Sequence, residues 1–378
     1  MEIKNYTNSY KYFNSLESKL FQNKFDFLNL ETISNSKFES HVNNLSRGVE
    51  RPDIFEEVIK DIYPIPPFSK WKYSEQKFSL LDQPVKSLKS SSRPNSLNSL
   101  IDWIKSKSDR LKTKKIAVEL SGGLDSSIII ELLNLSGLEI TLIGLISKNF
   151  EFRTERLIQE HYSKRNNSIL IDSKDALPFS NLLECPAHPL PTKKSLFFSQ
   201  KEVIAKKCAE EKIDFLFNGI IGDTVFCDKI ESTRWCKWEF DNNWFNDFVF
   251  LPQKVSYITT NFDFVLDYFF NQRKNEDSDP FKIWARNHFK DILPKTLSNY
   301  YYKTDHFEEI IEGIYSAEND ISETYKLTNW LTKNHLFTFE SLGKDLNKFK
   351  QMNDMEINTF FAKVSYSVWI YSLRNILD

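Results

Sequence analysis

The sequence predicts an α/β protein: helices wrap a parallel sheet, with a small N-terminal domain before it and a helical C-terminal part after it. Two observations lead to this prediction. Between about residues 116 and 217, short apolar runs alternate with segments of helical spacing, and the connections are short. Beyond about residue 230 the chain is rich in Trp, Tyr and Phe and reads as mainly helical. Strands that alternate with helices in this way are typical of parallel sheets.

The individual elements follow from local patterns. Apolar runs predict buried strands at 116–120, 139–146, 168–171 and 214–217. Helical spacing predicts helices at 126–135, 154–165 and about 200–212. Gly137 is expected to cap the first of these helices at its C-terminus. The lysine-rich segment 105–115 is expected to form an amphipathic helix whose basic face is solvated.

The predicted domain organisation has three parts. Residues 1–83 mix short apolar stretches with polar breaks and are expected to form a small N-terminal domain. Residues 84–99 contain Pro84, Pro94 and a run of serines, which is typical of a linker. Residues 100–378 form the main domain. A chain of 378 residues with 40% hydrophobic residues is long enough to bury a sizeable core.

Composition excludes several classes of protein. The 50 Lys and Arg residues balance 52 Asp and Glu residues, which argues against a protein that coats nucleic acid. No apolar run reaches the roughly 18 residues of a membrane span. The N-terminus has no apolar signal core, so a cytoplasmic protein is expected. The four cysteines form no CxxC pair and the six histidines no HxxxH or HExxH pattern, so no zinc site is indicated.

The most specific pattern is Ser121-Gly122-Gly123-Leu124-Asp125-Ser126-Ser127, which lies between a predicted strand and a predicted helix. Its glycines let the backbone approach an anion, and the N–H groups and dipole of the helix start favour a phosphate. Asp125 suits such a site only when a cation accompanies the phosphate, so Mg²⁺ between carboxylate and phosphate is expected. The loop is not the GxxxxGK[ST] pattern, which disfavours a Walker-type NTPase.

This SGGLDSS segment resembles the signature of the PP-loop ATP pyrophosphatases, which cleave ATP between the α and β phosphates. It is most similar to the asparagine synthetase branch, which includes β-lactam synthetase and the lasso-peptide cyclases. The resemblance implies ATP and Mg²⁺ as cofactors, with residues 121–127 binding the nucleotide. The segment 141–146 resembles the family strand whose end presents backbone groups to adenine. Gly144 and Leu145 are therefore implied as further nucleotide-binding residues.

Two later segments resemble other landmarks of this family. Residues 218–226 follow a predicted strand and are similar to the family's acidic SGxGxDE loop, with Gly219 and Asp223 in the matching places. The resemblance implies that Asp125 and Asp223 hold Mg²⁺ at the carboxyl ends of two strands, where open α/β sheets bind ligands. Leu293-Pro294 followed by Lys303 resembles the segment with the catalytic lysine, which stabilises charge on the pyrophosphate. An ordinary surface lysine is the alternative for Lys303.

The departures from the family pattern lie at positions implied to handle the amine substrate rather than at positions implied to bind the phosphate. Ile220 replaces an acidic residue of the second loop, and Thr224 replaces the Glu after Asp223. Glu2 stands where glutamine-dependent relatives carry a nucleophilic cysteine, so the N-terminal 83 residues resemble a reduced, non-catalytic glutaminase remnant. The resemblance implies an ATP-dependent carbon–nitrogen ligase that adenylates a carboxylate, accepts an amine and releases AMP and pyrophosphate.

The expected substrate is a peptide or peptide-like natural product that is closed into a macrolactam or lasso. A precursor peptide and a biosynthetic partner protein are the expected partners, with no nucleic acid and no membrane. Three alternatives remain. An ammonia-dependent asparagine synthetase needs an acidic or polar group where Ile220 stands. A tRNA-modifying PP-loop enzyme predicts a basic surface and often paired cysteines. An inactive ATP-binding scaffold fits the altered segment 224–228, but not the intact residues 121–127 and Asp223.

Overall fold

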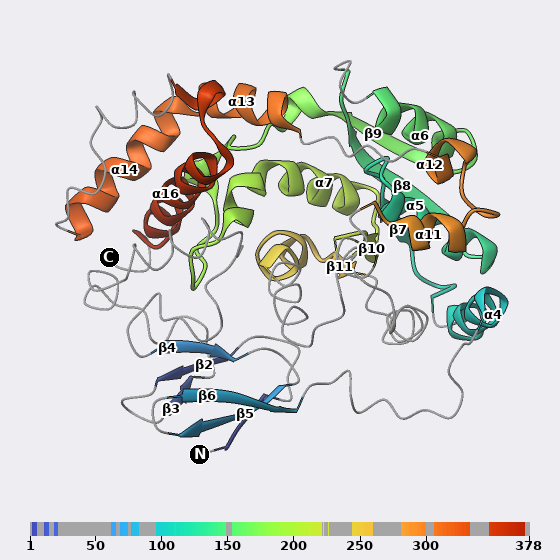
Figure 1. The fold of residues 1–378 in the computed structure, drawn as a ribbon, viewed down its shortest axis with the longest axis horizontal. Helices are drawn as coiled ribbons and strands as arrows, with labels where there is room; N and C mark the ends of the chain where they lie inside the picture. The colour runs from blue at the N-terminus through green and yellow to red at the C-terminus, as the bar shows by residue number, and fades with distance from the viewer. Residues whose placement is uncertain are drawn as a thin grey trace.

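The structure is a computed structural model (Figure 1). It describes residues 2–5, 11–14, 19–21, 62–65, 69–74, 77–82, 96–109, 111–148, 153–220, 222, 226, 244–259, 281–299, 306–332 and 348–374.

A five-stranded parallel sheet organises the described part of the main domain. Its strands are β7 (Ile116–Glu119), β8 (Ile140–Ile146), β9 (Asn167–Asp172), β10 (Phe215–Asn218) and β11 (Ser256–Thr259). Their order across the sheet is β11-β10-β7-β8-β9, and every neighbouring pair is parallel. The predicted α/β fold class, a parallel sheet wrapped by helices, is confirmed.

Helices cover both faces of this sheet because its strands alternate. Ile116 and Val118 of β7 face one hydrophobic cluster, and Ala117 between them faces the other. The first cluster is completed by α4 (Leu97–Ser108), α5 (Leu124–Leu135), α6 (Arg153–Ser163), α11 (Ile283–His288) and α12 (Lys295–Asn299). The second is completed by α7 (Phe198–Glu210), α13 (Phe307–Ser316), α14 (Glu318–Thr332) and α16 (Asp354–Ser372). Figure 1 shows α14 and α16 side by side.

Short helical turns join these elements. A π-helical turn, η5 (Asn246–Phe250), precedes β11. The other turns are 3-10 helices: η2 (Ser173–Asp175), η3 (Leu182–Glu184), η4 (Lys193–Phe197), η6 (Leu251–Gln253) and η7 (Phe349–Gln351). Among the helices that the structure describes, none is both long enough and apolar enough to cross a membrane.

Two elements differ from the prediction. Strand β11 lies in the part of the chain that was expected to be mainly helical. It has only four residues, and its parallel pairing with β10 determines its position. The lysine-rich segment 105–115 is not one helix, because α4 begins earlier and ends at Ser108. The Ser96 and Ser99 hydroxyls each accept a hydrogen bond from the other's backbone N–H at its start. Backbone bonds to the Ser108 carbonyl then turn the chain toward β7.

The strands of the first 82 residues form two antiparallel sheets. One has the order β1-β5-β6, formed by Glu2–Asn5, Ser69–Ser74 and Lys77–Asp82. The other has the order β3-β2-β4, formed by Lys19–Phe21, Lys11–Asn14 and Ile62–Ile65. The assignment of residues 1–83 as a glutaminase remnant, of 84–99 as a linker and of 100–378 as the synthetase domain stays a prediction.

Candidate active site

The predicted phosphate loop, residues 121–127, leads from β7 into α5 at the carboxyl edge of the sheet. Gly122 has φ +83°, a left-handed conformation that favours glycine, and a Cβ there would lie 2.5 Å from the Glu155 carbonyl oxygen. Gly123 is the N-cap of α5 and, because it has no side chain, supplies no side-chain cap; its own N–H donates to the Ser121 hydroxyl at 3.2 Å. The first N–H groups of a helix have no partner within the helix. They are therefore suited to bind an anion at this edge.

The three serines of the loop have different environments. Ser127 is fully buried, and its hydroxyl donates to the Gly123 carbonyl at 2.8 Å. The buried Ser126 hydroxyl donates to the same carbonyl at 3.2 Å. Ser121 is exposed, and its Oγ lies 3.0 Å from the Ser126 Oγ. The Ser126 and Ser127 hydroxyls therefore stabilise the loop through its backbone, while the exposed Ser121 hydroxyl is accessible to a ligand. Leu124 is buried in the core, so only its backbone can contact a nucleotide.

The second glycine loop meets the first at Asp125. Strand β10 lies next to β7, with Phe217 paired to Val118. A Cβ on Gly219 would lie 2.9 Å from the Ser126 nitrogen and 3.0 Å from the Asp125 Cβ. A Cβ on Gly222 would overlap the Asp125 carboxyl group. The two loops can approach this closely only because these positions are glycine.

Asp125 is held by a lysine that the sequence analysis did not single out. Lys282 Nζ lies 2.7 Å from Oδ1 and 2.6 Å from Oδ2 of Asp125. The two side chains are only 12% and 20% exposed, respectively. The next turn is anchored by Arg286, which donates to the carbonyls of Phe281 and Leu297. No local pattern distinguished Lys282 from the other basic residues of the chain.

Two predicted site residues, Asp223 and Lys303, lie outside the described residues, so their roles stay predictions. Within the described ranges, no group of three His, Cys, Asp or Glu side chains is arranged to hold a metal ion. Among the described residues, the fit to Mg²⁺ therefore depends on Asp125. Its carboxylate is a hard oxygen ligand, and it lies in the first turn of α5. In the structure its charge is balanced by Lys282.

A cavity of about 310 Å³ opens beside Ser121. Its apolar lining includes Leu145, Phe197 and Ile310, and its acidic lining consists of Glu119, Glu155 and Glu309. Leu145, a predicted nucleotide-binding residue, belongs to this wall. The other, Gly144, is not part of the lining; it is buried against Leu120, where a Cβ would overlap the Leu120 carbonyl oxygen.

Buried polar side chains stiffen the wall of this cavity. The Gln159 amide donates to the Leu120 carbonyl at 3.1 Å and to the Leu145 carbonyl at 2.7 Å, which ties the ends of β7 and β8 together. Glu119 forms an ion pair with Lys201 of α7 and accepts a hydrogen bond from the Tyr257 hydroxyl at 2.6 Å. Burial and the nearby Glu119 carboxylate raise the pKa of Tyr257 well above its ordinary value. Tyr257 is therefore a neutral donor at physiological pH.

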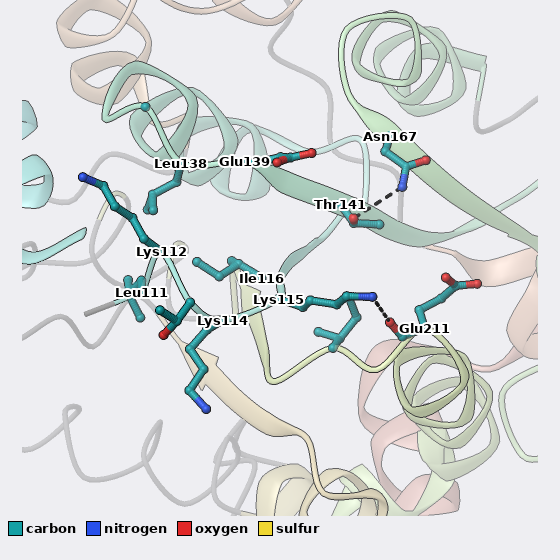
Figure 2. A pocket seen from close by; sticks show the side chains of 13 residues that line it. Leu111, Lys112, Lys114, Lys115, Ile116, Leu138, Glu139, Thr141, Asn167 and Glu211 are labelled. Carbon is teal, nitrogen blue, oxygen red and sulfur yellow. Dashed lines mark hydrogen bonds between the residues drawn. The ribbon is translucent and has the colours of Figure 1, made fainter. Parts of the chain in front are cut away.

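A larger cavity, of about 640 Å³, lies at the opposite edge of the sheet (Figure 2). It is lined by Lys112, Lys114 and Lys115 before β7 and by Glu139 and Asn167 at the amino ends of β8 and β9. The lysines already contact neighbouring acidic side chains or backbone: Lys112 pairs with Asp109, Lys114 with Asp214, and Lys115 donates to the Glu211 carbonyl. Parallel α/β sheets bind ligands at the carboxyl ends of their strands. The smaller cavity, which Leu120, Ser121 and Leu145 line, lies at that edge.

Comparisons with known proteins add little to this geometry. No protein-family model matches the chain, and no curated protein matches it either. One similar solved structure is the NMN synthetase from Francisella tularensis, with a TM-score of 0.32 and 12% sequence identity. The match covers 68% of this chain and 93% of that chain. At that TM-score the likeness says nothing about activity.

Proposed function

We propose that this chain is an ATP-dependent carbon–nitrogen ligase of the PP-loop type. The observation that supports this most is the meeting of two glycine loops around Asp125 at the carboxyl ends of β7 and β10. An open helix N-terminus, a carboxylate and a lysine together suit a magnesium-bound pyrophosphate. A surface turn used only for folding does not need two loops packed this closely.

The 310 Å³ cavity is the proposed place of the nucleoside. Its volume falls at the lower end of the roughly 300–1,000 Å³ that is usual for small-ligand pockets. Leu145 and Phe197 supply apolar surface for the base, and Ser121 connects the cavity to the phosphate loop. The nucleotide would then extend from this cavity to the N-terminus of α5.

The reaction would proceed in two steps. A carboxylate oxygen of the substrate attacks the α-phosphorus of ATP, the bond between the α-phosphorus and the bridging oxygen breaks, and pyrophosphate leaves. An amine then attacks the acyl carbon of the adenylate, loses a proton and expels AMP. The loop N–H groups and the Lys282 ammonium would stabilise the charge that develops on the pyrophosphate. Mg²⁺, held by Asp125 and by the predicted ligand Asp223, would supply further charge neutralisation.

Ile220 bears on which amine the proposed reaction would use. This side chain is partly buried and packs against the larger hydrophobic cluster of the domain. It cannot accept a proton at the place where relatives that use ammonia carry an acidic group. We therefore favour a peptide or peptide-like substrate, closed into a macrolactam or lasso, over asparagine formation from ammonia.

The test is to measure AMP and pyrophosphate with ATP and Mg²⁺, using candidate peptides in one arm and aspartate with ammonia in the other. Equal amounts of AMP and pyrophosphate are expected with a peptide. Asp125→Asn should lower the rate by about 100-fold or more because it weakens the proposed Mg²⁺ site, and Lys282→Met should do so because it removes a cation that would stabilise the pyrophosphate. Asp102→Asn is the matched control, since Asp102 on α4 is 76% exposed.

Three results would count against the proposal. Formation of ADP and phosphate would exclude adenylation. AMP release that does not depend on Asp125 would place the chemistry elsewhere. Turnover only with aspartate and ammonia would retain the ligase but overturn the peptide substrate.

A further inference from the structure

One wall of the 310 Å³ cavity comes from α13, a helix far from the phosphate loop in sequence. His306, Glu309 and Ile310 at the start of this helix line the cavity. Glu309 is 7% exposed. Its Oε1 atom is shielded from solvent and has no hydrogen-bond partner within 3.5 Å among the described residues. Its Oε2 atom lies 3.5 Å from Nδ1 of His306. A buried acceptor without a partner is unfavourable unless a ligand donates to it.

Glu309 is an anion at neutral pH. Burial by itself would raise the pKa of its carboxyl group. The neighbouring His306 imidazole and the hydroxyls of Ser173 and Ser147 outweigh this effect and hold the pKa below its ordinary value. An ionised carboxylate only accepts hydrogen bonds. The part of a ligand that contacts Glu309 must therefore carry donors.

The position of Glu309 is set by a close contact one turn further along α13. A Cβ on Gly313 would overlap the Pro178 carbonyl oxygen, so α13 can lie against residues 177–178 only with glycine there. That turn is itself anchored: the Ser199 hydroxyl donates to the Leu177 carbonyl at 2.6 Å, and Phe179 N donates to the Leu196 carbonyl at 2.6 Å. Glu309 is therefore held on a rigid wall.

We propose that Glu309 recognises the ribose of the bound nucleotide by accepting a hydrogen bond from its 2′- or 3′-hydroxyl. This inference rests on the proposed use of ATP. The same cavity borders Ser121 of the phosphate loop and contains the apolar residues Leu145 and Phe197, so the sugar lies between phosphate and base. Of the two other carboxylates that line the cavity, Glu119 is already engaged by Lys201 and Tyr257. A ribose hydroxyl supplies the donor that the Oε1 atom of Glu309 lacks.

The experiment compares ATP, 2′-deoxy-ATP and 3′-deoxy-ATP by titration calorimetry in the presence of Mg²⁺. The wild-type protein should bind at least one deoxynucleotide about tenfold more weakly than ATP, because a hydrogen bond to a charged acceptor is lost. Glu309→Gln should reduce this discrimination to about threefold, since a neutral acceptor makes a bond roughly half as strong. Glu312→Gln on the same helix is the control, because Glu312 is exposed and should keep the wild-type ratios.

A second variant tests the position of the carboxylate rather than its charge. Gly313→Ala keeps Glu309 but forces α13 away from Pro178, so it should also reduce the preference for ATP over the deoxynucleotide. A fall in overall stability alone would lower all three affinities together and leave their ratio unchanged. The ratio therefore separates ribose recognition from a general structural effect.

The outcomes are distinct. Equal affinity of the wild type for all three nucleotides, or unchanged discrimination in Glu309→Gln, would overturn the ribose assignment and leave the ligase proposal standing. Nucleotide binding that is unchanged in Glu309→Gln, with a raised KM for the amine substrate, would assign the carboxylate to the amine instead. No binding of ATP to the wild type would overturn both proposals.

Discussion

Gly222→Ala would test whether the contact between the two glycine loops is required for activity. The Gly222 N–H donates to the Gly219 carbonyl at 2.9 Å, which closes a tight turn against Asp125. An added Cβ would fall within 3.0 Å of the Cβ, Cγ and Oδ2 atoms of Asp125, whereas ordinary contacts lie at 3.4–4 Å. The substitution therefore requires either the loop or the Asp125 side chain to move.

The Asp125 side chain has little freedom to move. Lys282 holds both of its carboxylate oxygens, at 2.7 and 2.6 Å, so a rotation of the carboxyl group would break this ion pair. The second loop must then retreat by a distance on the order of 1 Å. A misplacement of about 1 Å at a reacting centre can reduce the rate by about 100-fold. We expect a loss of that size in Gly222→Ala.

The assay is ATP-dependent pyrophosphate release, with thermal unfolding measured in parallel. Gly137→Ala is the matched control: no atom lies within 4 Å of an added Cβ, but φ is +76°. It should cost about 1–2 kcal/mol of stability, because an L-residue is strained in this conformation, and leave the rate unchanged. If Gly222→Ala kept more than about a third of the wild-type rate, or if Gly137→Ala lost as much activity, the reasoning about loop contact would be refuted.

Three further predictions concern buried groups. Lys201→Met should lower the free energy of unfolding in urea by about 3 kcal/mol, because it leaves the Glu119 carboxylate buried without its cation. The double variant Lys201→Met/Glu119→Gln should recover at least part of this loss, and a double variant no more stable than the single one would contradict the ion-pair account. Burial raises the pKa of Cys208 to about 12 and that of Cys185 still further, so mass spectrometry should find neither alkylated at pH 8 until the protein unfolds. Rapid labelling of either thiol in the native protein would show that it is accessible. Because the folded pKa of Glu309 is lowered from 4.5, its carboxylate stabilises the fold above that pH, and this contribution is lost as the pH falls through the folded pKa. Glu309→Gln should therefore lose less stability than the wild type below about pH 4.5. An acid unfolding curve identical to that of the wild type would argue against a stabilising role of the Glu309 carboxylate.

Four of the five strands of the central sheet could be predicted, because each of them has a local pattern. Residues 116–118 are apolar on both faces, as expected for a strand covered by helices on both sides. Gly137 was predicted as the C-cap of α5; Ser136 is the C-cap, and Gly137 follows it with φ +76°. Strand β11 had no comparable signal, because four residues of mixed polarity are compatible with several structures. Its parallel pairing with β10 decides its conformation.

The residues of the candidate site also differ in how far the local sequence predicts them. The phosphate loop could be recognised from sequence, because glycine conformation and the start of a helix are properties of a few adjacent residues. Gly219, by contrast, was predicted from the resemblance of residues 218–226 to the family's second loop, which follows another predicted strand. The predicted roles of Asp223 and Lys303 rest on resemblance and stay predictions.

The charged contacts were decided by the tertiary structure. Lys282 lies 157 residues from Asp125, and Lys201 lies 82 residues from Glu119. Glu309 reaches the cavity only because Gly313 lets α13 lie against Pro178. An ion pair depends on distance and burial rather than on sequence spacing, and no local pattern records either quantity. The sequence by itself therefore predicted a candidate anion site, and the tertiary structure determined which distant side chains surround it.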